Sequence, residues 1–127
     1  MIEKAKQVFD IEIKGLEFVK NNLPEYFNEI IEKILSTKGK LIVSGMGKSG
    51  HIGKKIAATL ASTGTPSFFI HPGEAFHGDL GMIEPHDAVL LISYSGETEE
   101  ILRLIPFLNW NKNLTIGMSG NSNSSLA

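Results

Sequence analysis

Four short apolar runs, separated by longer segments with helical spacing, constrain the fold of this chain more than any other feature. The runs cover residues 41–43, 67–70, 88–92 and 114–118. Runs without polar alternation are typical of strands that are buried on both faces of a parallel sheet. The alternation of strands and helices therefore predicts an α/β fold, with an open parallel sheet and flanking helices. Right-handed crossovers would place all strand-to-helix loops at one edge of that sheet.

Two helices are expected before the first strand, because apolar residues recur there at helical spacing. The first stripe consists of Ala5, Phe9, Ile13 and Leu16, and the second of Phe27, Ile30, Ile31, Ile34 and Leu35. Pro24 suits the first position of the second helix, and Gly39 suits its C-terminal cap. Residues 1–39 are thus expected to be a helical lead-in of the same domain as residues 40–127.

The segments between the strands predict two further helices. Ile52, Ile56 and Leu60 are spaced for a helix that Gly64 would cap. The second helix follows the third strand, and Pro106 should kink it or end it early. Residues 71–87 are expected to form a loop, which holds three of the four histidines. The last residues, 124–127, resemble the start of a helix, so the domain is expected to be incomplete at its C-terminus.

Composition excludes several classes of protein. The 127 residues suit one domain and include no cysteine, which rules out disulfides, thiolate nucleophiles and cysteine-ligated zinc. Twelve basic against 14 acidic residues argue against nucleic acid as a partner. No apolar stretch is long enough for a membrane span, and the N-terminus is not a secretory signal. The expected location is therefore the cytoplasm, away from membranes.

Three loops that follow predicted strands are rich in glycine and hydroxyl side chains. They cover residues 44–50, 93–98 and 119–124. Each would start a helix, where unpaired N–H groups and the helix dipole favour an anion. Ligands of doubly wound sheets bind where the strand order reverses, often between the first and third strands. A phosphorylated small molecule is the natural ligand, although such residues also cap helices and form turns without binding anything.

The first loop is similar to two nucleotide-binding patterns but departs from both. Residues 45–50 match G-x-G-x-x-G, yet the second strand ends at His71 and Pro72, without the acidic residue that holds a ribose. Glu74 lies further on in the loop. The phosphate-loop pattern requires a glycine where this chain has Ile42. A dinucleotide-binding domain therefore remains a third, weaker hypothesis.

Several titratable side chains are candidates for chemistry in the cleft. The Lys48 ammonium could pair with a phosphate or polarise a carbonyl oxygen, or it could simply be solvated. Glu97 and Glu99 are expected to be partners of the helix dipole in a first turn. His71 and His77 could transfer protons or bind metal, although their spacing is not diagnostic of a metal site. The other two histidines, at positions 51 and 86, look structural or exposed.

Residues 45–83, together with the sequence SYSGETEE at 93–100, resemble the SIS (sugar isomerase) domain of bacterial D-arabinose 5-phosphate isomerases. The resemblance begins near Lys40 and implies a flavodoxin-like or Rossmann-like three-layer fold. It also implies interconversion of D-ribulose 5-phosphate and D-arabinose 5-phosphate through an enediol. This reaction leads toward Kdo for lipopolysaccharide or capsule in the cytoplasm of a Gram-negative bacterium. No cofactor is implied.

The same resemblance assigns roles to individual residues. The catalytic group would comprise Lys48, His77 and Glu100. The substrate-binding residues would be Gly47, Ser49, Gly64, Thr65, Ser93, Ser95 and Thr98. His71 corresponds to a histidine associated with an inhibitory metal. Gly64 and Thr65 should lie at the wrong end of the sheet, so they would act from another subunit of a homodimer or homotetramer.

The family also carries a downstream glutamate and histidine, and usually two CBS modules, that this chain lacks. We therefore expect either an isomerase whose activity in this chain alone is open, or a phosphosugar-binding module without catalysis.

Overall fold

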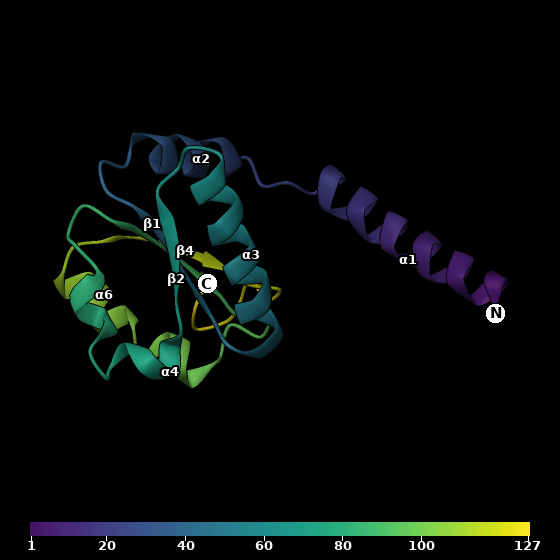
Figure 1. Ribbon diagram of the computed structural model, residues 1–127. Coiled ribbons are helices and arrows are strands. Elements are labelled where there is room, and N and C mark those ends of the chain that lie inside the picture. Colours follow the sequence, from purple (N-terminus) through teal and green to yellow (C-terminus); the bar gives the residue numbers. More distant parts are fainter. The chain divides into compact units, whose positions relative to one another are not determined.

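A computed structural model describes all 127 residues (Figure 1). The chain forms two compact units, Met1–Glu32 and Lys33–Ala127. The first unit contains helix α1 (Ile2–Asn21) and the beginning of helix α2 (Phe27–Ser36). The two predicted N-terminal helices are therefore present. Within its own unit α1 buries none of its side chains. No helix of the structure combines the length and apolar character needed to cross a membrane.

The second unit is built on a four-stranded parallel sheet (Figure 1). Its strands are β1 (Leu41–Gly45), β2 (Ser67–Ile70), β3 (Ala88–Ile92) and β4 (Leu114–Met118), in the order β2-β1-β3-β4. Leu41 pairs with Ser67 on one side and with Ala88 on the other. All four predicted strands are confirmed. Since β2 lies on one side of β1 and β3 on the other, the order reverses between β1 and β3.

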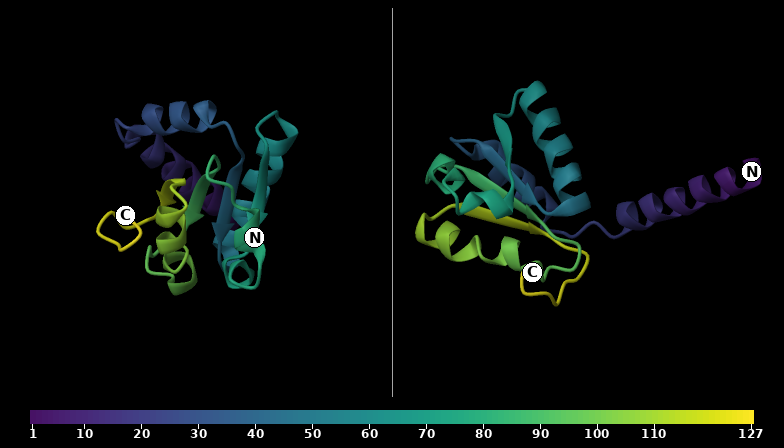
Figure 2. Two further views of the ribbon diagram at one scale, coloured as in Figure 1. Left: turned by 90° about the vertical axis from the view of Figure 1, so that its left-hand side faces the viewer. Right: turned by 60° about the horizontal axis from the view of Figure 1, so that its bottom comes forward.

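Helices cover both faces of the sheet (Figure 2). Helix α3 (Gly47–Ser62) packs through Ala57, Ile56 and Leu60 on the face that carries Leu41 and Val43. The other face is covered by α4 (Pro72–Ala75), the short 3-10 helix η1 (Asp79–Met82), α5 (Glu99–Leu102) and α6 (Ile105–Trp110). Strand side chains alternate between the two cores, as the pleat requires. The predicted three-layer α/β architecture is confirmed.

The amino end of α3 lies directly against the end of β1. A Cβ on Gly50 would lie 2.6 Å from the backbone oxygen of Gly45, so only glycine allows this approach. At its other end α3 is capped as predicted, because Gly64 has a φ of +102° and Thr65 N–H donates to Leu60 O at 2.9 Å. The early end predicted for the helix after β3 is also confirmed, since α5 ends at Leu102 and Pro106 lies in the first turn of a separate helix, α6.

Several local expectations are wrong. Helix α2 begins at Phe27, so Pro24 lies before it, and it ends at Ser36, so Gly39 is not its cap. Gly39 is needed instead because a Cβ there would overlap the Asp87 carboxylate. Residues 71–87 are not a plain loop, since they contain α4 and η1.

The C-terminal residues 124–127 also differ from expectation. They form no helix, with a bend at residues 124–125, and Leu126 N–H donates to Gly96 O at 3.0 Å. This hydrogen bond returns the backbone to the loop after β3. A contact with a distant segment therefore overrides the local helix signal.

A buried carboxylate organises the amino edge of the sheet. Asp87 is 1% exposed and accepts hydrogen bonds from Lys40 N–H at 2.7 Å and from Glu84 N–H at 2.8 Å. The Lys40 ammonium donates to the Glu84 carboxylate at 3.3 Å and lies 3.7 Å from Asp87. The hydrogen bond to Glu84, followed by the charge of Asp87, raises the pKa of Lys40. These contacts join the start of β1 to the turn before β3.

Candidate functional site

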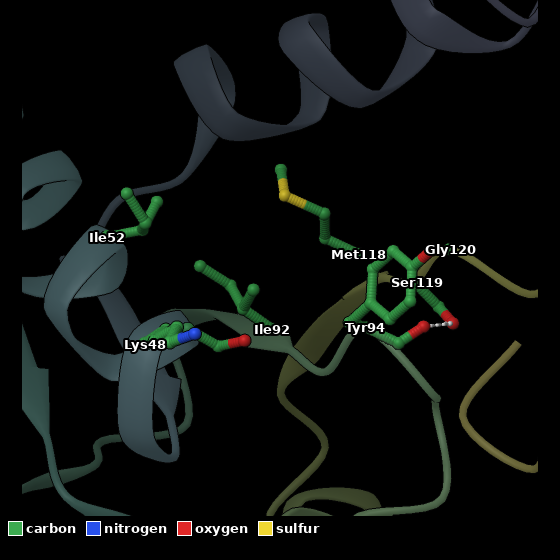
Figure 3. A pocket seen from close by; sticks show the side chains of 8 residues that line it. Lys48, Ile52, Ile92, Tyr94, Met118, Ser119 and Gly120 are labelled. Carbon is green, nitrogen blue, oxygen red and sulfur yellow. Dashed lines mark hydrogen bonds between the residues drawn. The ribbon is translucent and has the colours of Figure 1, made fainter.

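The first turns of α3, which follows β1, meet the ends of β3 and β4 and the loops after them in one pocket at the carboxyl edge of the sheet (Figure 3). The pocket measures about 340 Å³ and is lined by Lys48, Ser49, Ile52, Ile92, Tyr94, Met118, Ser119 and Gly120. This volume is within the usual range for small-molecule sites, about 300–1,000 Å³. The pocket lies beside the point where the strand order reverses, as the parallel topology predicts.

The amino end of α3 supplies a positive wall. Gly47, with a φ of +52°, opens the helix, and no side chain caps it at Met46. The first N–H groups of a helix have no partner within it, so they remain available to a ligand. Lys48 is exposed and its ammonium lies in the pocket opposite Tyr94 (Figure 3). Dipole, N–H groups and ammonium together favour an anionic or strongly polar ligand.

The loop of residues 93–98 is folded by its own hydroxyls. Ser93 is buried, and its Oγ lies 2.7 Å from Thr98 Oγ1 and accepts the Gly96 N–H at 3.0 Å. Ser95 is exposed, and its Oγ accepts the Glu97 N–H at 3.2 Å. The three hydroxyls predicted to hold a phosphate therefore lie together in one compact turn.

The loop after β4 is hydrogen-bonded to the loop after β3. Gly120 N–H donates to Tyr94 O at 2.9 Å, and the N–H and Oγ of Ser125 each donate to the Glu97 carboxylate at 2.7 Å. The N–H of Ser125, and then its hydroxyl, hold the pKa of Glu97 below its ordinary value. The expectation that Glu97 is a first-turn dipole partner is wrong, because α5 begins only at Glu99.

The other two predicted catalytic residues lie away from the lining of the Lys48 pocket. Glu100 is half-buried in the first turn of α5, and His77 is exposed just after α4. The Arg103 guanidinium lies 4.9 Å from the centre of the Phe76 ring, and α4 contacts α5. The structure thus brings the segment of His77 beside the helix of Glu100. Lys48 lines a pocket to which neither of them contributes.

His71 lines a second, smaller hollow of about 130 Å³ together with Gly47. Its Nδ1 accepts the Gly73 N–H at 3.1 Å, so in the neutral imidazole Nε2 carries the proton and is left as a donor. No three His, Cys, Asp or Glu side chains are grouped to hold a metal ion. The association of His71 with a metal stays a prediction. His51 and His86 are exposed, as expected.

Neither nucleotide-binding pattern gains support. His71 directly follows β2, where a dinucleotide site needs an acidic side chain. Ile42, which replaces the glycine of a phosphate loop, is fully buried within β1.

Gly64 and Thr65 line a hollow of about 260 Å³ at the opposite edge of the sheet, beside Gly39, Leu41 and Pro66. They follow α3 and precede β2, whereas Lys48 lies at the start of α3. As the topology predicts, one chain cannot bring them to the Lys48 pocket.

Sequence reasoning missed the apolar walls of the pocket, among them Ile92, Tyr94 and Met118. The signal was positional, because Ile92 and Met118 are the last residues of predicted strands and Tyr94 is the second residue after one. Tyr94 is 84% exposed, and its ring lies so close to Gly120 that a Cβ there would be 2.8 Å from it.

Curated proteins related to this chain carry consistent names. It is 57% identical over 124 residues to the arabinose 5-phosphate isomerase KdsD of Yersinia pestis, which covers 98% of this chain and 38% of that protein. It is 61% identical over 101 residues to the arabinose 5-phosphate isomerase KpsF of Escherichia coli O6:H1, which covers 80% of this chain and 31% of that protein. The chain thus spans less than two fifths of either relative.

Solved structures and a domain family model also match this chain. The structure of E. coli CFT073 c3406 in complex with A5P matches with a TM-score of 0.94 and 47% identity, over 99% of this chain and 67% of that one. Phosphoheptose isomerase GmhA of Neisseria gonorrhoeae, at 14% identity over 98% of this chain and 77% of that one, shares the fold with a TM-score of 0.79. The SIS domain profile matches residues 34–127, and the chain therefore belongs to the SIS domain family.

Proposed function

We propose that the protein is an aldose–ketose isomerase that interconverts D-ribulose 5-phosphate and D-arabinose 5-phosphate. The observation that carries the proposal is the pocket between β1 and β3, where Lys48 and the uncapped start of α3 face the ends of β3 and β4. Relatives at 57% and 61% identity are named arabinose 5-phosphate isomerases, and c3406 was solved with A5P bound. A sugar phosphate fits both the volume and the electrostatics of this site.

The residues suggest a division of labour. Ser93, Ser95 and Thr98 would hold the phosphate with hydroxyl donors that do not repel it, and Gly47 and Ser49 would add contacts at the start of α3. Isomerisation moves a proton from C2 of the aldose to C1 through an enediol, so it needs a base and a group that stabilises the oxyanion. Lys48 would stabilise the oxyanion, and Glu100 or His77 would transfer the proton.

Further parts of the proposal concern assembly and setting. We propose a homodimer or homotetramer in which Gly64 and Thr65 reach the site of a neighbouring subunit. Apolar side chains of α1 that stay uncovered within their own unit, such as Phe9 at 65% exposure, support an interface there. Residues 1–39 would then be the lead-in that mediates assembly. We place the enzyme in the cytoplasm, in Kdo synthesis for lipopolysaccharide or capsule, with His71 as the site of an inhibitory metal.

The decisive experiment incubates the chain with ribulose 5-phosphate and measures arabinose 5-phosphate, beside a full-length active isomerase. Product above the level of a Lys48→Ala variant supports the proposal. No product, with the control active, rejects catalysis by this chain.

A phosphosugar-binding module without catalysis is the second candidate, favoured by the absence of His77 and Glu100 from the lining of the Lys48 pocket. It predicts saturable binding of arabinose 5-phosphate by calorimetry together with zero turnover. Absence of binding would exclude both functions.

A further inference from the structure

We propose that Glu97 is a positioning residue, which fixes the phosphate-binding loop by holding Ser125 of the loop after β4. The proposal rests on the proposed function for the identity of the ligand, but the tie between the two loops stands on contacts within this chain. The hydrogen bonds of Glu97 go to Ser95 and Ser125, which do not line the Lys48 pocket. Glu97 would therefore act on ligand binding only through the loop that it holds.

The tie is made by two short hydrogen bonds to one carboxylate. The Ser125 N–H donates to Glu97 Oε1 and the Ser125 Oγ donates to Oε2, both at 2.7 Å. Glu97 and Ser125 are 28 residues apart in sequence. Bonds to an ionised acceptor are stronger than bonds between neutral groups, and the two together fix the carboxylate in orientation as well as position.

Neighbouring contacts between the same two segments support the hydrogen bonds of Glu97. Leu126 N–H donates to Gly96 O at 3.0 Å, directly beside Glu97, and Leu126 packs against the core of the sheet. Gly96 has a φ of +70°, and a Cβ there would overlap Ser124, which is itself buried. Residues 124–126 therefore pack directly against the turn that carries Ser93, Ser95 and Thr98.

The consequence concerns the hydroxyls of that turn. Ser95 Oγ accepts the N–H of Glu97. The backbone of Glu97 therefore orients a hydroxyl that we propose binds the phosphate. If Glu97 releases Ser125, a smaller fraction of molecules holds the turn in the binding arrangement, and the apparent affinity falls by that fraction.

A purely electrostatic role makes the opposite prediction. Glu97 carries a negative charge near a site for a dianion, so its removal alone should tighten phosphate binding. Glu99 offers the matched control, because it is also an exposed glutamate in the same segment and no side-chain hydrogen bond involves it. The sign of the change therefore separates positioning from charge.

The test measures binding of inorganic phosphate and of arabinose 5-phosphate to the 127-residue chain by calorimetry. We expect Glu97→Ala to weaken both affinities at least about fivefold, whereas Glu99→Ala leaves them unchanged or tighter. Glu97→Gln should restore binding to within about twofold, because its amide oxygen can accept the Ser125 N–H and its NH₂ can donate to Ser125 Oγ. In an active preparation, Glu97→Ala should raise KM with little change in kcat.

Hydrogen exchange at the Leu126 amide gives an independent measure of the tie. Protection should fall in Glu97→Ala and persist in Glu97→Gln. Equal affinities for Glu97→Ala and Glu99→Ala would overturn the proposal. If the unmutated chain binds neither ligand, the proposed function fails, and unchanged Leu126 exchange in Glu97→Ala would then separately overturn the tie.

Discussion

Replacement of Asp87 by alanine should destabilise the sheet strongly while leaving the ligand site intact. Its carboxylate is buried and accepts two backbone N–H groups, those of Lys40 and Glu84. A hydrogen bond to a charged group contributes about 1.5–3 kcal/mol, and the Lys40 N–H is only partly buried, so we expect Asp87→Ala to cost about 3–5 kcal/mol. This is a large share of the total stability of a small domain, about 5–15 kcal/mol.

The assay is thermal unfolding followed by far-ultraviolet circular dichroism. For a domain of this size each kcal/mol shifts Tm by about 4–8 °C, so Asp87→Ala should lower Tm by at least about 12 °C. Asp87→Asn should recover no more than half of the loss. It keeps one acceptor oxygen, but its NH₂ group faces a backbone N–H donor.

Glu84→Gln is the matched control, because its side chain is exposed and its backbone N–H bond to Asp87 is kept. It should unfold close to the unmutated Tm, since exposed ion pairs contribute little. Affinity for sugar phosphate, measured well below Tm, should not change in Asp87→Ala because the site lies at the other edge of the sheet. The reasoning fails if Asp87→Ala shifts Tm by less than about 5 °C, or if Glu84→Gln is equally destabilising.

Three further predictions concern Lys48, Gly50 and Lys40. Lys48→Ala should reduce turnover at least about a hundredfold with unchanged circular dichroism, because it removes the oxyanion partner; an unchanged rate would assign Lys48 to the solvent. Gly50→Ala should cost about 1–3 kcal/mol in urea unfolding, since its Cβ meets β1 backbone at 2.6 Å, whereas Gly81→Ala meets nothing within 4 Å and should be neutral. Because the pKa of Lys40 is raised, its contribution to stability is complete below about pH 10.4 and is lost as pH rises through the raised pKa. Lys40→Met should therefore make Tm depend less on pH in that alkaline range.

The strands and their common loop edge could be predicted because each depends on local pattern plus one topological rule. The run at 88–92 is apolar throughout and is fully buried as β3. Once the strands are parallel, the loops after β1, β3 and β4 must lie at one edge, and Lys48, Tyr94 and Gly120 indeed line one pocket.

Contacts between distant segments could not be predicted in this way. Residues 124–127 carry a local helix signal, but hydrogen bonds to Gly96 and Glu97 determine their conformation instead. Gly39 was expected to cap a helix, whereas its true constraint is the approach of Asp87, 48 positions later in the chain. Both of these misses involve a partner that lies far away in the sequence.

The strand order also has a consequence for how the protein folds. The contact between Ser44 and Ile70 joins β1 to β2 over 26 residues, and that between Asp87 and Asn113 joins β3 to β4 over the same separation. The contact between Lys40 and Asp87, which joins β1 to β3, spans 47 residues. Closing the longer loop costs more chain entropy, so two strand–helix–strand halves should form before they dock. Lys48 belongs to one half and Tyr94 to the other, so we expect the pocket to be complete only when the two halves dock.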